Sequence, residues 1–177
     1  LAQALTATGQ PGEAAREYQA ALELDPDSAN AHFDLAVLAL RARREAEAIA
    51  SFRKAMRCRP DWPMAASNLA LLLATARDPS LREPAEAVAL ARRAVERTNE
   101  TDPKSLSALA AAYASAGDFP RAVGAARQAI DVARAAGNEK LAEALAGHLA
   151  TYEAGRPLVE AAPTRPTAGP PASAPLP

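Results

Sequence analysis

The feature that most constrains this 177-residue chain is a set of residues that recurs every 34 positions. Small, aromatic and proline residues return at this step in the same order, and a leucine keeps the same phase. They are Ala14, Tyr18, Ala21 and Pro26, then Ala48, Phe52, Ala55 and Pro60, with Leu1, Leu35 and Leu69. A fixed period of this length indicates stacked copies of one small unit. Alanine, which makes up more than a quarter of the residues, favours helices that pack closely.

Apolar spacing and end signals predict two helices in each unit. We expect helices at 1–8, 11–24, 29–42, 45–58, 63–76, 84–97, 103–116, 119–136 and 138–154. Pro26 and Pro60 follow the second helix of their units and stop it. Gly9 and Gly117 suit a left-handed turn between the paired helices. Arg43 stands at the equivalent place in the second unit, a departure that costs up to ~1 kcal/mol.

These helices group into four units, a cap and a tail. The expected limits are a truncated first unit at 1–28, units at 29–62, 63–102 and 103–137, a capping helix at 138–157 and a tail at 158–177. The third unit holds about five extra residues, near 77–84, relative to the standard period. In the cap, Leu141, Leu145 and Leu149 form one apolar stripe of the kind that closes a solenoid. The tail is rich in Pro and Ala without periodicity, so we expect disorder there.

The spacing and residue types resemble the tetratricopeptide repeat (TPR), whose pattern is W-x2-L-G-x2-Y, then A-x3-F, then P. The second unit matches it with His32-x2-Leu35-Ala36, Ala48-x3-Phe52 and Pro60. The resemblance covers roughly residues 1–136. It implies an all-α, right-handed superhelical solenoid of antiparallel helix pairs with a C-terminal capping helix. It also implies a non-catalytic module that binds a protein partner.

In this family the first helix of each repeat lines a concave groove that faces a bound peptide. By resemblance, the groove-lining residues here are Asn30, Phe33, Asp34, Val37, Arg41, Met64, Ser67, Asn68, Leu71, Thr75, Lys104 and Ser107. The groove would have an apolar side, formed by Phe33, Val37, Met64 and Leu71, and a small polar side. Such a surface suits a peptide with a few apolar anchors. An equal alternative for Phe33 and Val37 is that they pack between neighbouring repeats.

One subfamily holds the C-terminal carboxylate of a chaperone in a clamp of Lys, Asn and Arg side chains. Asn68 and Lys104 match two of the clamp positions. The remaining positions hold Phe33, Val37 and Ala108, which cannot donate hydrogen bonds to a carboxylate. We therefore expect no chaperone-tail clamp in this chain.

No residue pattern in the sequence indicates catalysis, a cofactor or a metal site. The G-x-S-x-G, Walker, H-E-x-x-H and EF-hand patterns are absent. His32 and His148 are far apart in the sequence, and we interpret both as packed or half-exposed side chains. Cys58 lies between two arginines, which would favour a reactive thiolate. An inert thiol is the preferred interpretation, because no second cysteine or neighbouring histidine accompanies it. We expect no enzyme activity in this segment.

Composition narrows the partner class. A net charge of -1 argues against nucleic acid, which selects a basic face. The longest apolar run, residues 69–76, is far too short to cross a bilayer. The expected partner is therefore a protein or peptide, and we expect no direct membrane insertion. The compartment, cytoplasmic or periplasmic, stays open.

Two further hypotheses remain beside the interaction module. Residue 1 falls inside a predicted helix, so we expect a piece of a longer protein. Residues 69–75, 85–97 and 149–157 resemble repeats at the ends of large bacterial TPR proteins, some of them membrane glycosyltransferases of the protein O-mannosyltransferase type. In that case catalysis would lie upstream, and a missing N-terminal part would tether this segment to a membrane. Self-association through an apolar edge at Leu1 and Leu5 is the second alternative.

Overall fold

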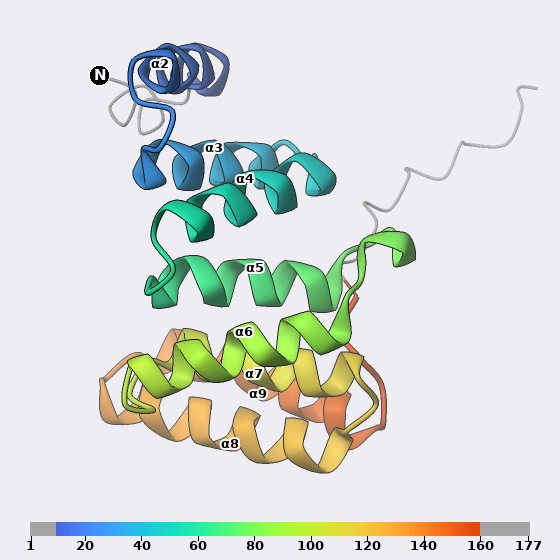
Figure 1. Ribbon diagram of the computed structural model, residues 1–177. Coiled ribbons are helices and arrows are strands. Elements are labelled where there is room, and N and C mark those ends of the chain that lie inside the picture. Colours follow the sequence, from blue (N-terminus) through green and yellow to red (C-terminus); the bar gives the residue numbers. More distant parts are fainter. Residues whose placement is uncertain (1–9, 160–177) are drawn as a thin grey trace, which may run out of the picture.

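Residues 10–159 are described by a computed structural model of the chain, and they form a stack of helices (Figure 1). Within this range the structure has eight α-helices, one short 3-10 helix and no strand. The helices are α2 (Pro11–Leu24), α3 (Ala29–Arg41), α4 (Glu45–Cys58), α5 (Pro63–Thr75), η1 (Pro79–Leu81), α6 (Pro84–Arg97), α7 (Pro103–Ser115), α8 (Phe119–Ala135) and α9 (Glu139–Glu153). Consecutive helices pair as α3 with α4, α5 with α6 and α7 with α8. The expected all-α solenoid is confirmed, while the helix predicted at 1–8 lies outside the described residues.

Proline and glycine mark the helix ends where the sequence indicated. Pro11, Pro63, Pro84 and Pro103 occupy the first turns of their helices. A missing backbone N–H carries no penalty there, because the first-turn N–H groups have no partner within the helix. Gly117 has a φ of +82° in the turn between α7 and α8, a conformation that glycine adopts without steric cost.

Arg43 adopts the same left-handed conformation in the turn between α3 and α4, with φ of +62°. A side chain with a Cβ is disfavoured there, so the expected departure at this position is a real feature of the turn. Gly9, its counterpart one repeat earlier, lies outside the described residues. Several first helices end one residue before the predicted position, because Ala42, Ala76 and Ala116 cap the helix instead of extending it.

Two apolar clusters hold the stack together. The larger one runs continuously from α3 to α9, and its largest fully buried side chains are Phe52, Leu69, Leu73, Leu106 and Tyr152. The smaller one joins α2 to the opposite side of α3 through Ala14, Tyr18, Ala31 and Leu38. Alanines at the helix contacts are completely buried, among them Ala48, Ala55, Ala70, Ala122 and Ala129. Their small size allows the helix axes to approach closely, as the alanine content predicted.

The insertion expected near 77–84 lies between α5 and α6 and contains η1. It is anchored by Glu45, a carboxylate at the start of α4 that is only 6% exposed. Arg77 donates to Glu45 from its Nε at 2.8 Å and from its backbone N–H at 3.1 Å. Arg82 then donates from its Nε to the carbonyl of Ala76 at 2.6 Å, and its guanidinium also reaches the carbonyl of Arg77. These contacts fix the path of the insertion against the preceding repeat.

The capping helix α9 packs on α8 and turns its charged side outward, with Glu139, Lys140 and Glu143 exposed. Leu158, just beyond the boundary expected at 157, packs against the larger core. The rest of the expected tail, residues 160–177, is outside the described range. No helix in the part that the structure describes is both long and apolar enough to span a bilayer.

Enlarging Ala55 tests the close packing of α4. Ala55 is completely buried, so Ala55→Leu is expected to destabilise the chain by about 1–3 kcal/mol through overpacking. Ala50→Leu on the same helix is the matched control, because Ala50 is exposed. Urea unfolding of both variants gives the comparison. Equal stability of the two variants would show that Ala55 does not lie between packed helices.

Candidate functional site

A pocket on the first-helix side of the repeats is the candidate binding site. It has a volume of about 300 Å³ and an apolar lining with a few polar groups. We call it the α5 pocket, and its lining residues are Leu40, Asn68, Leu71, Leu72, Thr75, His148, Leu158 and Val159. These residues come from α3 and α5, the first helices of two successive repeats, from the capping helix α9 and from the segment after α9. An apolar pocket with a few polar groups is the usual form of a binding site.

The residues expected to line the groove fall into three groups by exposure. Exposed ones are Asn30, Arg41, Met64, Leu71 and Lys104; half-buried ones are Asp34, Val37, Asn68, Thr75 and Ser107; buried ones are Phe33 and Ser67. Met64 is 51% exposed and Leu71 is 38% exposed, which is unusual for large apolar side chains. The structure brings Asn68, Leu71 and Thr75 together in the α5 pocket.

Phe33 and Ser67, two of the residues expected in the groove, are buried. Phe33 is 9% exposed, and its ring centroid lies 5.5 Å from that of Phe52 and 4.6 Å from that of Trp62. It therefore fills the junction between the second and third repeats. Ser67 is buried, and its hydroxyl lies 2.9 Å from that of Ser105 across the contact between α5 and α7. Neither side chain is available to a partner in this structure.

The polar side of the pocket is satisfied by its own helix. Asn68 donates from its amide to the carbonyl of Met64 at 2.8 Å, and Thr75 donates to the carbonyl of Leu71 at 2.8 Å. Asn68 is thus engaged without any ligand. Both side chains therefore already bond the backbone of their own helix.

Sequence reasoning missed five lining residues: Leu40, Leu72, His148, Leu158 and Val159. Leu72 lies next to Leu71 on α5, and the groove pattern of the family selected only one of the pair. The last three come from beyond the repeats, where the family pattern no longer applies. The apolar pair at 158 and 159 ahead of a Pro-rich stretch was the available signal.

His148 is the electrostatically distinct group in the pocket wall. Its Nδ1 is buried without a hydrogen-bond partner among the described residues, as is the hydroxyl of Tyr152 one turn later. Burial lowers the pKa of His148 and raises that of Tyr152, because both charged forms would lose hydration. Both groups are therefore neutral at pH 7, and the wall presents no charge to an apolar ligand.

Lowering the pH is expected to reduce the free energy of unfolding more in the parent chain than in a His148→Gln variant. The folded state lowers its pKa below the unfolded value of about 6.5, so below that pH the unfolded chain binds the proton more readily. Stability linked to His148 is thus present at pH 7 and is lost as the pH falls from about 6.5. Urea unfolding at pH 7 and pH 5.5 should show a smaller loss for His148→Gln than for the parent. Because His32 is present in both proteins, any contribution from it cancels in the comparison. An equal loss would contradict the buried, neutral state of the imidazole.

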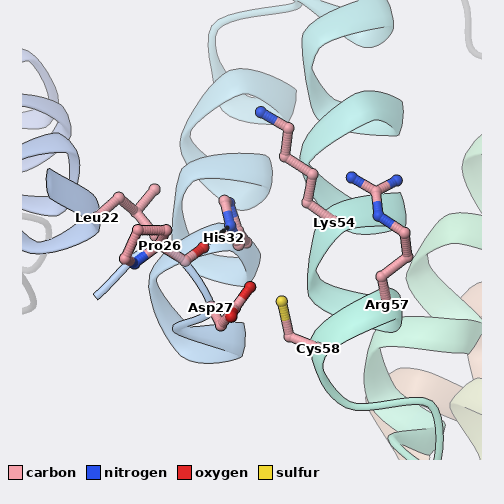
Figure 2. A pocket seen from close by; sticks show the side chains of 7 residues that line it. All are labelled: Leu22, Pro26, Asp27, His32, Lys54, Arg57 and Cys58. Atoms are coloured by element: carbon pink, nitrogen blue, oxygen red, sulfur yellow. Dashed lines mark hydrogen bonds between the residues drawn. The ribbon is translucent and has the colours of Figure 1, made fainter. Parts of the chain in front are cut away.

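A second, larger cleft of about 680 Å³ lies between α2, the connection to α3 and the end of α4 (Figure 2). We call it the α2–α4 cleft, and it is lined by Leu22, Pro26, Asp27, His32, Lys54, Arg57 and Cys58. His32 is buried, and its Nε2 lies 2.9 Å from the carbonyl oxygen of Pro26, which confirms the expected packing role. Cys58 is half-buried, and no hydrogen bond joins it to His32 within the described range. Residues 10–159 also hold no cluster of three metal-ligating side chains.

Ion pairs join helices of neighbouring units. Arg53 of α4 donates to Glu83 and Glu86 at the start of α6, and these bonds raise the pKa of Arg53. The hydrogen bond from Arg53 in turn lowers the pKa of Glu83. Arg127 of α8 similarly lies 2.8 Å from Glu153 of α9. Each of these exposed ion pairs contributes little to stability. Their charged groups are already paired within the chain and are less available to a partner.

Repeated helix pairs with a pocket on one side define an α-helical repeat scaffold. Two family models described as tetratricopeptide repeat match the sequence, at residues 1–63 and 105–140, and together they span more than half of the chain. The chain belongs to the tetratricopeptide repeat family. No curated protein sequence is significantly similar to it.

Solved structures of the same fold extend over most of the chain. MamA from Desulfovibrio magneticus RS-1 has 16% identity and a TM-score of 0.64, covering 86% of this chain and 91% of that one. PilW, described as a type IV pilus biogenesis factor, has 19% identity and a TM-score of 0.63, covering 86% and 74%. YrrB, described as a TPR protein with an unusual peptide-binding site, has 21% identity and a TM-score of 0.59, covering 86% and 83%. At these identities the likeness establishes the fold alone.

Proposed function

We propose that this chain binds an extended segment of a protein partner along the first-helix side, with apolar side chains of the partner anchored in the α5 pocket. The observation that carries the proposal is the exposure of Leu71 beside an apolar cavity. Exposed apolar side chains around a pocket are typical of binding surfaces, where desolvated anchors supply most of the affinity. The solved TPR protein YrrB, described as having a peptide-binding site, supports this class of ligand.

The remaining exposed residues of the expected groove extend the proposed surface beyond the pocket. Asn30 and Arg41 belong to α3, Met64 to α5 and Lys104 to α7. Asn30, Arg41 and Lys104 would supply hydrogen bonds and charge around an apolar centre, which is the usual arrangement of an interface rim. Met64 would add apolar contact. This rim would orient the partner segment, while the α5 pocket would supply the anchor.

The alternative origin of the chain does not change this proposal. If the segment is the C-terminal appendage of a membrane glycosyltransferase, the catalytic part lies upstream of residue 1. Helices α3 to α9 would then recruit a protein substrate or a regulator to that enzyme through the same surface. In either case the role proposed for residues 10–159 is binding.

Selection from a displayed random peptide library, using the full chain as bait, tests the proposal. Hydrogen–deuterium exchange of the chain with and without a selected peptide then locates the binding surface. We expect slowed exchange at the end of α3, in α5 and in α9. Slowed exchange confined to the second helices α4, α6 and α8 would contradict the proposal, and so would a folded chain that selects no peptide.

A further inference from the structure

The segment after α9 already occupies one end of the proposed binding surface. Helix α9 ends at Glu153 with Ala154 as its C-cap, and Gly155 then takes a left-handed conformation with φ of +66°. The N–H groups of Gly155 and Arg156 donate to the carbonyls of Tyr152 and Thr151, at 2.9 and 3.1 Å. This bonding pattern is a Schellman motif, which fixes the exit direction of the chain. The five residues 155–159 therefore leave α9 along a defined path, and we call them the strap.

The strap turns back across the first helices. Pro157 disfavours a helical conformation at Arg156, so the strap leaves α9 extended. Leu158 then packs against the larger core, and Val159 lies at the wall of the α5 pocket opposite residues of α3 and α5. In Figure 1 the segment that follows α9 runs from the lower part of the stack toward the end of α5. Residues about 80 positions apart in the sequence thus line one cavity.

The two aliphatic residues of the strap differ in how firmly they are held. Leu158 is half-buried, whereas Val159 is 47% exposed although it lines the pocket. No hydrogen bond within the described range joins the backbone of either residue to α3 or α5. The strap is therefore held at the pocket by apolar contact alone, at about 25 cal/mol per Å² buried. A contact of this kind can be exchanged for an equivalent one from another chain.

We propose that the strap is an internal ligand of the α5 pocket, and that the partner is an extended segment with adjacent aliphatic side chains that displaces Val159 and then Leu158. This inference rests on the proposed function and adds the class of partner and the regulation of the site. Leu158 and Val159 show the chemistry that the pocket accepts, which is two neighbouring aliphatic groups without charge. The strap and the bound partner compete for the same cavity, so the strap lowers the apparent affinity for the partner.

Thiol accessibility in the full chain tests the inference without any known ligand. In a Cys58→Ser background, Leu71→Cys places one thiol in the pocket, and Met64→Cys places one on the same face of α5 two turns away. Each cysteine variant is made with and without the double substitution Leu158→Asp and Val159→Asp. The rate at which a bulky maleimide alkylates the thiol is then measured. We expect displacement of the strap to speed reaction at position 71 by about fivefold or more, with no change at position 64.

The outcomes separate displacement of the strap from loosening of the whole fold. An unchanged rate at position 71 in a folded protein overturns the inference, whether or not a selected peptide binds. If the rate rises at both positions, the double variant has loosened the fold, and Val159→Asp alone decides, since its exposed side chain contributes little to packing. If Val159→Asp speeds alkylation at position 71 and not at position 64, the result supports the strap as an internal ligand. If Val159→Asp leaves the rate at position 71 unchanged, the inference is overturned.

A labelled peptide of residues 155–165, added to the full chain carrying Leu158→Asp and Val159→Asp, provides the second arm. Saturable binding that is lost on further Leu71→Asp substitution is the expected result. Absence of binding to a folded variant would overturn the strap as a ligand. The proposed function fails separately, if library peptides bind elsewhere while position 71 still becomes accessible.

Discussion

Replacing Phe52 with alanine is expected to lower the free energy of unfolding by about 3–5 kcal/mol. Phe52 is completely buried at the middle of α4, and its ring meets that of Phe33 edge-on at 5.5 Å. Its removal leaves a cavity between the second and third repeats, where the surrounding helices relax only in part. Aromatic pairing adds about 0.5–1.5 kcal/mol to the contribution of the buried area.

Urea unfolding followed by circular dichroism measures this loss. Leu24→Ala is the matched control, because Leu24 is a large apolar residue that is 89% exposed at the end of α2. The control is expected to stay within about 0.5 kcal/mol of the parent. A similar small loss for Phe52→Ala would mean that the repeat junction is not packed as described.

The second large effect concerns binding. Leu71→Asp is expected to weaken the affinity for a selected peptide by about 30-fold or more, the effect of losing a hot-spot side chain worth about 2 kcal/mol. The substitution removes an apolar anchor and places a charge that must lose hydration when the pocket is filled. The fold should survive, because Leu71 is partly exposed in the free chain. Titration of a labelled peptide by fluorescence anisotropy gives both affinities.

Ala89→Asp is the control for that substitution. Ala89 is exposed on α6, a second helix, so the same charge is added outside the pocket. The affinity of this variant should match that of the parent. If both variants lose affinity equally, the effect is one of net charge. If neither loses affinity, Leu71 is not an anchor and the pocket is not the binding site.

Much of the fold could be predicted from the sequence because its signals are local and repeated. A fixed 34-residue step, prolines at helix starts and Gly117 at a turn each specify a structure within a few residues of themselves. Burial of Ala55 and Phe52 then follows from stacking equivalent units. The anchoring of the insertion by Glu45 could not be predicted in this way, since it joins residues 32 positions apart in different repeats.

The candidate site was predicted only in part, for a physical reason. Family position selected Asn68, Leu71 and Thr75, which lie together at the α5 pocket. It could not distinguish exposed Leu71 from buried Phe33, because the orientation of one repeat on the next decides which side chains the junction covers. The strap was missed because Leu158 and Val159 follow the last repeat, where composition indicated only a tail.

Site-specific photocrosslinking tests the central claim, that the first-helix side holds the partner segment. A photoreactive amino acid is placed at position 71 or position 89 of the full chain, and each protein is irradiated with a selected peptide. We expect a crosslink to the peptide from position 71, mapped by mass spectrometry, and none from position 89. Crosslinking from position 89 alone would place the partner on the second helices and contradict the claim.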